Sequence, residues 1–195
     1  MRTIKTKKPK ILDATCSNRS MWKTKYSDKV LYIDVDPELE ITPDIITDCS
    51  HTDFDDGQFH TIFFDPPHIW GEKIGENIYA CRNRAERTAL LEKRGYENRG
   101  GIAYYGIDKF KTKVDLLQFV DDAQKEFYRI LSDGGMLWFR WSEWKIQLKE
   151  VMKLFGNWDK MLHIKEQPNS KLKRSTGKSK KHWIALTKAM IVGEE

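Results

Sequence analysis

A rigid acidic turn is the part of the sequence best suited to chemistry. Asp65, Pro66, Pro67 and His68 (DPPH) directly follow an apolar run. Two consecutive prolines restrict the backbone to an extended turn, so the Asp65 carboxylate and the carbonyls after it are held in defined directions. Such acceptors could grip an amino group. The alternative is a strand ending in a proline-rich turn with a solvated aspartate, and the motif alone does not separate the two.

Three more aspartates lie at or near the ends of predicted strands upstream of this turn: Asp13, Asp34 and Asp48. In a mostly parallel sheet they would collect at the carboxyl edge, where nucleoside-type cofactors bind. An acid after the second strand can also accept hydrogen bonds from a ribose. Aspartate is common in turns for structural reasons alone. Three acids in succession, followed by DPPH, favour a binding edge over three unrelated turns.

The elements that must position these residues follow an α/β pattern, because short apolar runs alternate with helical periodicity. Strands are predicted at 11–15, 30–36, 45–48, 59–65, 136–141, 161–165 and 182–186. A helix is predicted over 110–131, ended by Gly134-Gly135, and a shorter one over 146–155. The core-facing stripe of the longer helix would comprise Phe110, Val114, Leu117, Val120, Ala123, Phe127 and Ile130. The segment 68–108 breaks the alternation, and long connections after a strand are usually functional or disordered.

Composition points to one domain in a reducing compartment. The chain has 195 residues, and its hydrophobic fraction of 39% with 12% aromatics excludes a disordered chain. Cys16, Cys49 and Cys81 are widely spaced and form no CxxC pair, which argues against a disulfide framework or a zinc site. No metal is expected. No signal-peptide h-region follows the basic N-terminus and no apolar run approaches membrane-spanning length. We therefore expect a cytoplasmic protein with no membrane partner.

With these motifs in order, the sequence resembles the class I S-adenosylmethionine-dependent methyltransferases. More narrowly, it is similar to the amino-methyltransferases with a (D/N/S)PP(Y/F/W) motif, which act on exocyclic amines of adenine or cytosine. The resemblance covers nearly the whole chain and is carried by DATCSNRSMW, YIDVDPE, PDIITDCSHTDF, FFDPPH and KKHW. It looks closest to small phage and prophage adenine methyltransferases of the DPPH type.

The resemblance implies a class I methyltransferase fold: a Rossmann-like, mostly parallel sheet with an antiparallel terminal strand. Residues 1–195 would form a single methyltransferase domain, with 69–108 inserted as a substrate-facing segment. The implied cofactor is S-adenosyl-L-methionine. Its binding residues would be Asp13, Cys16 and Ser17 in the loop after the first strand, Asp34 or Asp36 at the ribose, Asp48 and Cys49 beside the adenine, and Asp65 at the junction with the substrate.

The resemblance also assigns the reaction to the DPPH turn. Asp65 and the Pro66 carbonyl would accept hydrogen bonds from the target amine, Pro67 would complete the rigid turn, and His68 would stack on the flipped base. Two positions depart from the family pattern. The loop ATCSNRS contains no glycine, and histidine replaces the usual aromatic residue after the prolines. Histidine adds a charge that depends on pH near neutrality.

Basic residues indicate where nucleic acid would bind. A predicted hairpin between the last two strands carries Lys171, Lys173, Arg174, Lys178, Lys180 and Lys181, and the 69–108 segment contributes Trp70, Arg82 and Arg84. Basic side chains in flexible loops neutralise phosphates, and aromatic rings stack on bases. The alternative for the hairpin is a solvated surface loop. Next to DPPH, we favour the phosphate contact.

The predicted function is methylation of adenine N6 in DNA, which is favoured over RNA. The alternatives within the same chemistry are an RNA adenine-N6 or a DNA cytosine-N4 methyltransferase, since DPPH does not distinguish them. An alternative of another class is a non-catalytic nucleic-acid-binding module on the same fold. Few residues outside the sheet remain to read a target, so we expect weak or short sequence recognition, or reliance on a protein partner.

Overall fold

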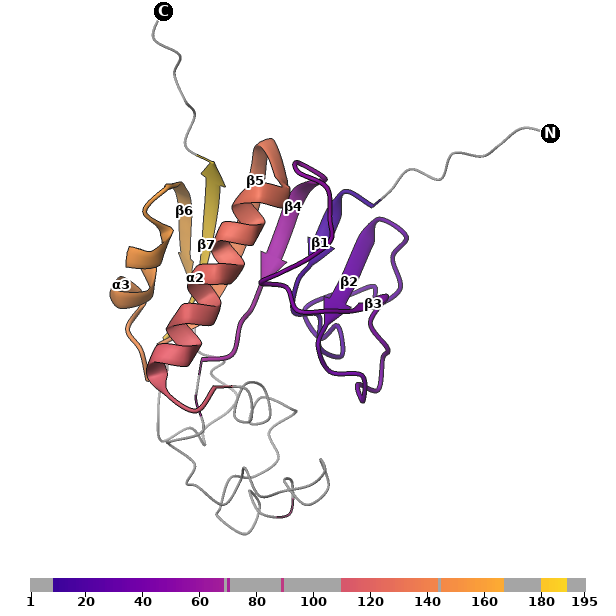
Figure 1. Ribbon diagram of the computed structural model, residues 1–195, viewed down its shortest axis with the longest axis horizontal. Helices are drawn as coiled ribbons and strands as arrows, with labels where there is room; N and C mark the ends of the chain where they lie inside the picture. The colour runs from indigo at the N-terminus through magenta and orange to yellow at the C-terminus, as the bar shows by residue number, and fades with distance from the viewer. Residues whose placement is uncertain are drawn as a thin grey trace, which may run out of the picture.

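The computed structural model describes residues 9–68, 70, 89, 110–143, 145–166 and 180–188. Their strands form one seven-stranded mixed sheet in the order β3-β2-β1-β4-β5-β7-β6 (Figure 1). The strands are β1 (Ile11–Asp13), β2 (Val30–Asp34), β3 (Ile45–Ile46), β4 (Phe59–Phe64), β5 (Leu131–Ser142), β6 (Trp158–Lys165) and β7 (Lys181–Lys188). Pairing is parallel from β3 to β5, and β7 is antiparallel to both its neighbours. The expected mostly parallel α/β sheet is confirmed at this level, although few helices accompany it among the residues that the structure describes.

Strand order reverses direction at the centre of the sheet. From β1 the chain builds outward through β2 and β3, then returns to place β4 and β5 on the other side of β1. The point between β1 and β4 is therefore a topological switch point, where open α/β sheets bind ligands beyond the carboxyl ends of their strands. Asp13 and Asp34 end β1 and β2, and Asp65 directly follows β4. Topology thus brings these three acids to one edge.

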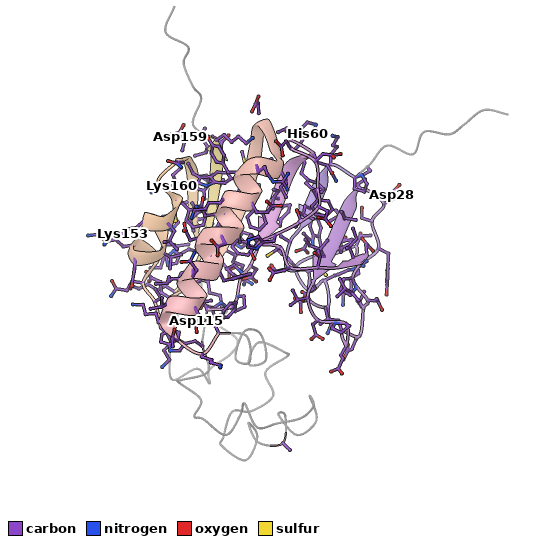
Figure 2. The ribbon with its side chains drawn as sticks, in the orientation of Figure 1. Asp28, His60, Asp115, Lys153, Asp159 and Lys160 are labelled. Atoms are coloured by element: carbon purple, nitrogen blue, oxygen red, sulfur yellow. The ribbon has the colours of Figure 1, made fainter. Side chains whose placement is uncertain are left out.

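The main helix, α2 (Lys113–Ile130), begins at a capping box in which Thr112 and Asp115 exchange side-chain-to-backbone hydrogen bonds. Figure 2 shows Asp115 at this end of the helix. Burial repeats at three- and four-residue steps: Leu116, Val120, Ala123, Phe127 and Ile130 are all inaccessible to solvent. The prediction for Val114 was wrong, since it is 71% exposed. Two residues before Leu116, it faces away from the buried stripe.

Helices cover one face of the sheet. The predicted helix over 146–155 is divided into α3 (Leu148–Val151) and a 3-10 turn, η3 (Met152–Phe155), which lie on the same side as α2 (Figure 1). Phe64, Phe139 and Trp141 meet them in the main core and are fully buried. Each such side chain contributes about 2–3 kcal/mol of apolar burial. Within the described residues, none of the helices is long and apolar enough to cross a membrane.

The strand β5 begins earlier than predicted and contains an irregularity. Leu131 already pairs with Phe59, and the register then shifts before Met136 pairs with Thr61. Gly134 lies in this stretch with a φ of +69°, a left-handed conformation that glycine adopts without a Cβ clash. The two glycines therefore permit a bulge inside the strand. The prediction that Gly134-Gly135 end the helix was wrong, because α2 ends at Ile130 and both glycines lie within β5.

The connection from β1 to β2 contains no helix and is held by one buried arginine. Ser17 and Arg19 adopt positive φ angles of 48° and 53°, which non-glycine residues rarely adopt. The Arg19 guanidinium donates hydrogen bonds to Lys25 O at 2.8 Å, Thr42 O at 3.0 Å and Asp44 Oδ1 at 3.0 Å. It also lies 3.9 Å from the centre of the Tyr32 ring. Arg19 therefore fastens the glycine-free loop to β2 and to the chain before β3.

Replacing this arginine should loosen the loop. Because a lysine ammonium cannot satisfy three separate acceptors in one plane, Arg19→Lys should lower the free energy of unfolding by about 2 kcal/mol and the Tm by roughly 5 °C. Thermal unfolding followed by circular dichroism measures this. Lys23→Ala, a change at an exposed residue of the same loop, is the matched control. Equal melting temperatures for the two variants would contradict an anchoring role.

Candidate functional site

The loop after β1 is bonded to both neighbouring strands at the carboxyl edge. Ala14 N donates to Phe63 O at 2.9 Å, and Cys16 N donates to Ile33 O at 3.0 Å. The hydroxyl of Thr15 accepts a hydrogen bond from the backbone N–H of Asp65 at 3.0 Å. The predicted cofactor loop and the DPPH turn are therefore in direct contact, which their separation of fifty residues in sequence does not reveal.

Asp13 is a fully buried acid at the centre of this edge. Its Oδ2 accepts a hydrogen bond from Trp22 Nε1 at 2.6 Å, and its Oδ1 lies 3.4 Å from Thr15 N. Burial, reinforced by the charges of Asp65 and Asp34, raises the pKa of Asp13 to about 7, and the bonds from Trp22 and Thr15 oppose this rise only in part. Asp13 can therefore change its charge near neutral pH.

Asp34 accepts hydrogen bonds from the backbone around it. Ser17 N donates to Oδ2 at 2.9 Å and Asp36 N to Oδ1 at 3.1 Å. Burial raises the pKa of Asp34 although these donors favour its charged form. Asp36 in turn accepts from Glu38 N at 2.9 Å. A carboxylate offers about four acceptor positions. Asp34 therefore shapes the loop and retains capacity for a ligand hydroxyl.

The remaining predicted cofactor residues are placed near the same edge but differ in character. Asp48 accepts hydrogen bonds from Ser50 N at 3.0 Å and Ser50 Oγ at 2.8 Å, in the turn after β3. Cys16 and Cys49 are buried free thiols, each 3% exposed. Burial raises the pKa of the Cys16 thiol, which therefore stays protonated. The two cysteine side chains pack against core residues.

Asp65 is paired with an arginine that sequence reasoning missed. Arg140, on β5, donates from Nη1 to Asp65 Oδ2 at 2.7 Å. Its other side meets Glu166, with Nε 2.8 Å from Oε1 and Nη2 3.3 Å from Oε2. The available signal was a charged residue inside the otherwise apolar strand MLWFRW. Its partner could not be read from sequence, because strand register decides it.

The His68 ring is held by the turn that contains it. Nδ1 lies 3.2 Å from Pro66 O, and since a carbonyl only accepts, this contact assigns a proton to Nδ1. The ring contacts buried Trp141 edge-on, with centroids 6.1 Å apart. Burial lowers the pKa of His68, and the nearby cations Arg140 and Lys181 lower it further. Asp65 and the Pro66 carbonyl raise the pKa but offset this decrease only in part. His68 is thus neutral at pH 7.

The predicted nucleic-acid contacts are described only in part. Lys180 is exposed and lies 3.9 Å from Glu143, and Lys181 is half-buried at the start of β7. Trp70 is 5% exposed and belongs to the main core, which favours packing over base stacking for its ring. The other predicted contacts lie outside the described residues: Arg82, Arg84, Lys171, Lys173, Arg174 and Lys178. Across the ranges that are described, no group of three or more His, Cys, Asp or Glu side chains is placed to hold a metal.

Comparison with known proteins does not identify a family for this chain. No protein-family model matches this chain, and no curated protein is significantly similar to it. The residues at the carboxyl edge of the sheet are therefore the basis on which a function can be inferred.

The buried acid at this edge should limit stability at high pH. Because the folded protein raises the pKa of Asp13 from 3.8 to about 7, its contribution to stability is full below pH 4 and is lost as pH rises through 7. The loss is at most about 4 kcal/mol. Asp13→Asn removes the charge and keeps an acceptor for Trp22. The variant should therefore gain thermal stability relative to the wild type at pH 8, and much less at pH 4.5.

Melting temperatures measured across this pH range test the prediction. Asp28→Asn, at an exposed turn position, controls for the change in net charge. A stability difference for Asp13→Asn that does not vary with pH would contradict the titration of this group.

Proposed function

We propose that this protein is an S-adenosylmethionine-dependent amino-methyltransferase of the class I fold, acting on the exocyclic amine of a nucleic-acid base. The observation that carries the proposal is the hydrogen bond between Asp65 N and Thr15 Oγ1. It joins a rigid amine-accepting turn to the loop where a nucleoside cofactor would bind. The strand order, 3-2-1-4-5 followed by an antiparallel β7 inserted before β6, supports the same fold.

The side chains at this edge suit a cationic cofactor. Asp13, Asp34 and Asp65 bring three carboxyl groups together. Because Arg140 offsets the charge of Asp65, the field that favours a sulfonium over an anionic nucleotide comes mainly from Asp13 and Asp34. Asp34 and Asp36 would hold ribose hydroxyls, Asp48 the adenine amino group, and the backbone of the 14–17 loop the amino-acid moiety. When bound, the cofactor supplies a methyl group that its sulfonium already activates.

The contribution of the chain is then alignment. An exocyclic amine is a poor nucleophile because its lone pair is delocalised into the ring. Asp65 Oδ1 and Pro66 O can accept hydrogen bonds from its two N–H groups and aim the lone pair at the methyl group. Forming the new N–C bond would break the bond from the methyl group to sulfur, and the methylated amine would then release one proton to Asp65 or to water. Pro66 O has a second lone pair available beside the one that faces His68 Nδ1. The neutral His68 ring is suited to stack on the base without adding a positive charge next to the sulfonium.

Adenine N6 in DNA is the target we put first, with RNA adenine N6 and DNA cytosine N4 as the chemical variants. A nucleic-acid-binding module without turnover is the second candidate. One observation favours it: both carboxylate oxygens of Asp34 already accept hydrogen bonds from backbone N–H groups of the protein, which leaves fewer acceptor positions for a cofactor. Measurable cofactor binding would argue strongly against this second candidate.

Methyl transfer to matched DNA and RNA substrates tests the proposal directly. Label from S-adenosylmethionine should appear in N6-methyladenine after digestion to nucleosides. Asp65→Ala should abolish transfer, and the near-isosteric Asp65→Asn should lower kcat by about a hundredfold or more, because an acceptor aimed at the amine is lost. Cofactor affinity by titration calorimetry should change less than about threefold, since the Thr15 bond uses the backbone.

Asp53→Asn, at an exposed position before β4, is the matched control and should behave as the wild type. Loss of cofactor binding in Asp65→Asn would place Asp65 in the cofactor pocket and contradict its assigned role. Absence of both transfer and cofactor binding in the wild type would support the non-catalytic module.

Histidine in the motif should give transfer a dependence on acid pH. Since burial lowers the pKa of His68 below its usual 6.5, the ring is neutral at pH 7 and gains a proton only as pH falls further. The imidazolium would repel the cofactor cation, so kcat should fall at this step. His68→Phe, which keeps a stacking ring, should lose this step from its pH profile between 5 and 8. Identical acid limbs in the two proteins would refute the assignment to His68.

A further inference from the structure

We infer that Arg140, anchored by Glu166, is a positioning residue that holds the Asp65 carboxylate with Oδ1 open toward the target amine. This inference rests on the proposed function and assigns how its acceptor is oriented. Arg140 was not part of any motif in the sequence, and none of the proposed cofactor contacts uses it.

Strand register places Arg140 beside Asp65. On the paired strands β4 and β5, Phe63 lies opposite Trp138 and Phe64 opposite Phe139. The next position brings Asp65 level with Arg140, on the face turned away from α2. The distance from Nη1 to Oδ2 is 2.7 Å, which is a short charge-assisted hydrogen bond. A side chain on the neighbouring strand thus determines where one oxygen of the motif carboxylate points.

Glu166 fixes the guanidinium from the opposite side. Its two oxygens meet Nε and Nη2 at 2.8 and 3.3 Å, a two-point contact that defines the plane of the group. Glu166 itself is tied to β7 through its backbone N–H, which donates to Lys181 O at 2.9 Å. The guanidinium carbon also lies 5.6 Å from the centre of the Trp183 ring. Arg140 is therefore held from three directions, by β4, by β7 and by the end of β6.

The three charged side chains are shielded enough for their pairing to matter. Arg140, Asp65 and Glu166 are 27%, 25% and 30% exposed. Although burial disfavours the charged guanidinium, Asp65 and Glu166 raise the pKa of Arg140. Burial likewise opposes the ionisation of Glu166, yet its bonds to Arg140 lower the pKa of that carboxyl. Arg140 and Glu166 are therefore both charged at neutral pH.

The bridge leaves one oxygen of Asp65 for a ligand. Oδ2 is engaged by Arg140, whereas Oδ1 accepts no hydrogen bond from any residue that the structure describes. Without the cation, the carboxylate would face Asp13 with no opposite charge beside it and would be free to turn away from it. Since an amine must be aligned to a fraction of an ångström for methyl transfer, such freedom would lower the turnover rate.

If Arg140 only stabilised the fold, its variants would lower the Tm and would not lower kcat of the folded protein. The variants are chosen to separate this stabilising role from a positioning role. Arg140→Lys keeps the charge but cannot contact both carboxylates in one plane. It should lower kcat by about tenfold or more while the cofactor KM changes less than about threefold. Glu166→Gln, which loosens the anchor, should lower kcat by less. Arg140→Ala should lose most activity and regain part of it when guanidinium ion is added.

Arg129→Lys is the matched control. Arg129 bridges Glu126 and Asp56 at 2.6 Å each, at the far end of α2 from the DPPH turn. Weakening this bridge should lower the Tm and leave kcat unchanged. The measured quantities are kcat, cofactor KM and Tm for each variant, with and without guanidinium ion.

Lower kcat in Arg140→Lys at an unchanged cofactor KM, with rescue of Arg140→Ala, supports the inference. Wild-type kcat in Arg140→Lys, or loss of kcat only in proportion to lost folded protein, overturns it. If Arg140→Ala does not fold, the Lys and Gln variants decide. A wild-type protein that transfers no methyl group overturns the proposed function and this role together, whereas active wild type with unaffected variants overturns the role of Arg140 alone.

Discussion

Three carboxyl groups share the carboxyl edge of one sheet, and the structure around them is organised by the free energy of holding them there. Like charges in a partly buried site repel, and each must be neutralised, hydrogen-bonded or paired. Each of the three is treated differently. Asp13 lies beside Trp22 with its pKa raised to about 7, Asp34 receives backbone N–H groups, and Asp65 is paired with Arg140. These separate solutions give each acid its own chemical character.

The loop after β1 shows how the chain forms a tight turn with left-handed residues but without glycine. Ser17 and Arg19 both occupy left-handed backbone conformations, which carry an energetic penalty of the order of 1 kcal/mol or more for residues with a Cβ. The buried Arg19 guanidinium offsets this penalty with three hydrogen bonds and close contact to Tyr32. Asp34 closes the same turn from inside by accepting from Ser17 N. Glycine adopts left-handed backbone conformations without a steric penalty. In this loop, hydrogen bonds made by side chains stabilise those conformations instead.

Local patterns predicted the strands and the main helix, because apolar runs and three- to four-residue spacing depend on nearby residues alone. They also predicted that Asp13, Asp34 and Asp48, followed by the DPPH turn, collect at the carboxyl edge, since parallel strands end on the same side. The pairing of Asp65 with Arg140 was not predictable, because these residues are 75 positions apart in sequence and meet only through the register between β4 and β5. The prediction that Val114 is buried was wrong for a related reason. An apolar side chain near an element's end is buried or exposed according to what packs against it.

The two faces of the sheet differ in character: one is apolar and packs against α2, and the other carries charged side chains. The face under α2 is filled by apolar residues such as Phe64 and Phe139, and it contains the main source of folding free energy. The opposite face carries Asp13, Asp65 and Arg140, joined through aromatic contacts that run from Trp22 to Phe63 at 5.1 Å and from Phe63 to Trp138 at 6.4 Å. A sheet selected only for stability would not place two acids and a bridged arginine on that face, because apolar residues of equal volume would pack there at lower free energy. The retained charges are consistent with the proposed cofactor, which carries a positive charge, and with the proposed target amine, which needs acceptors.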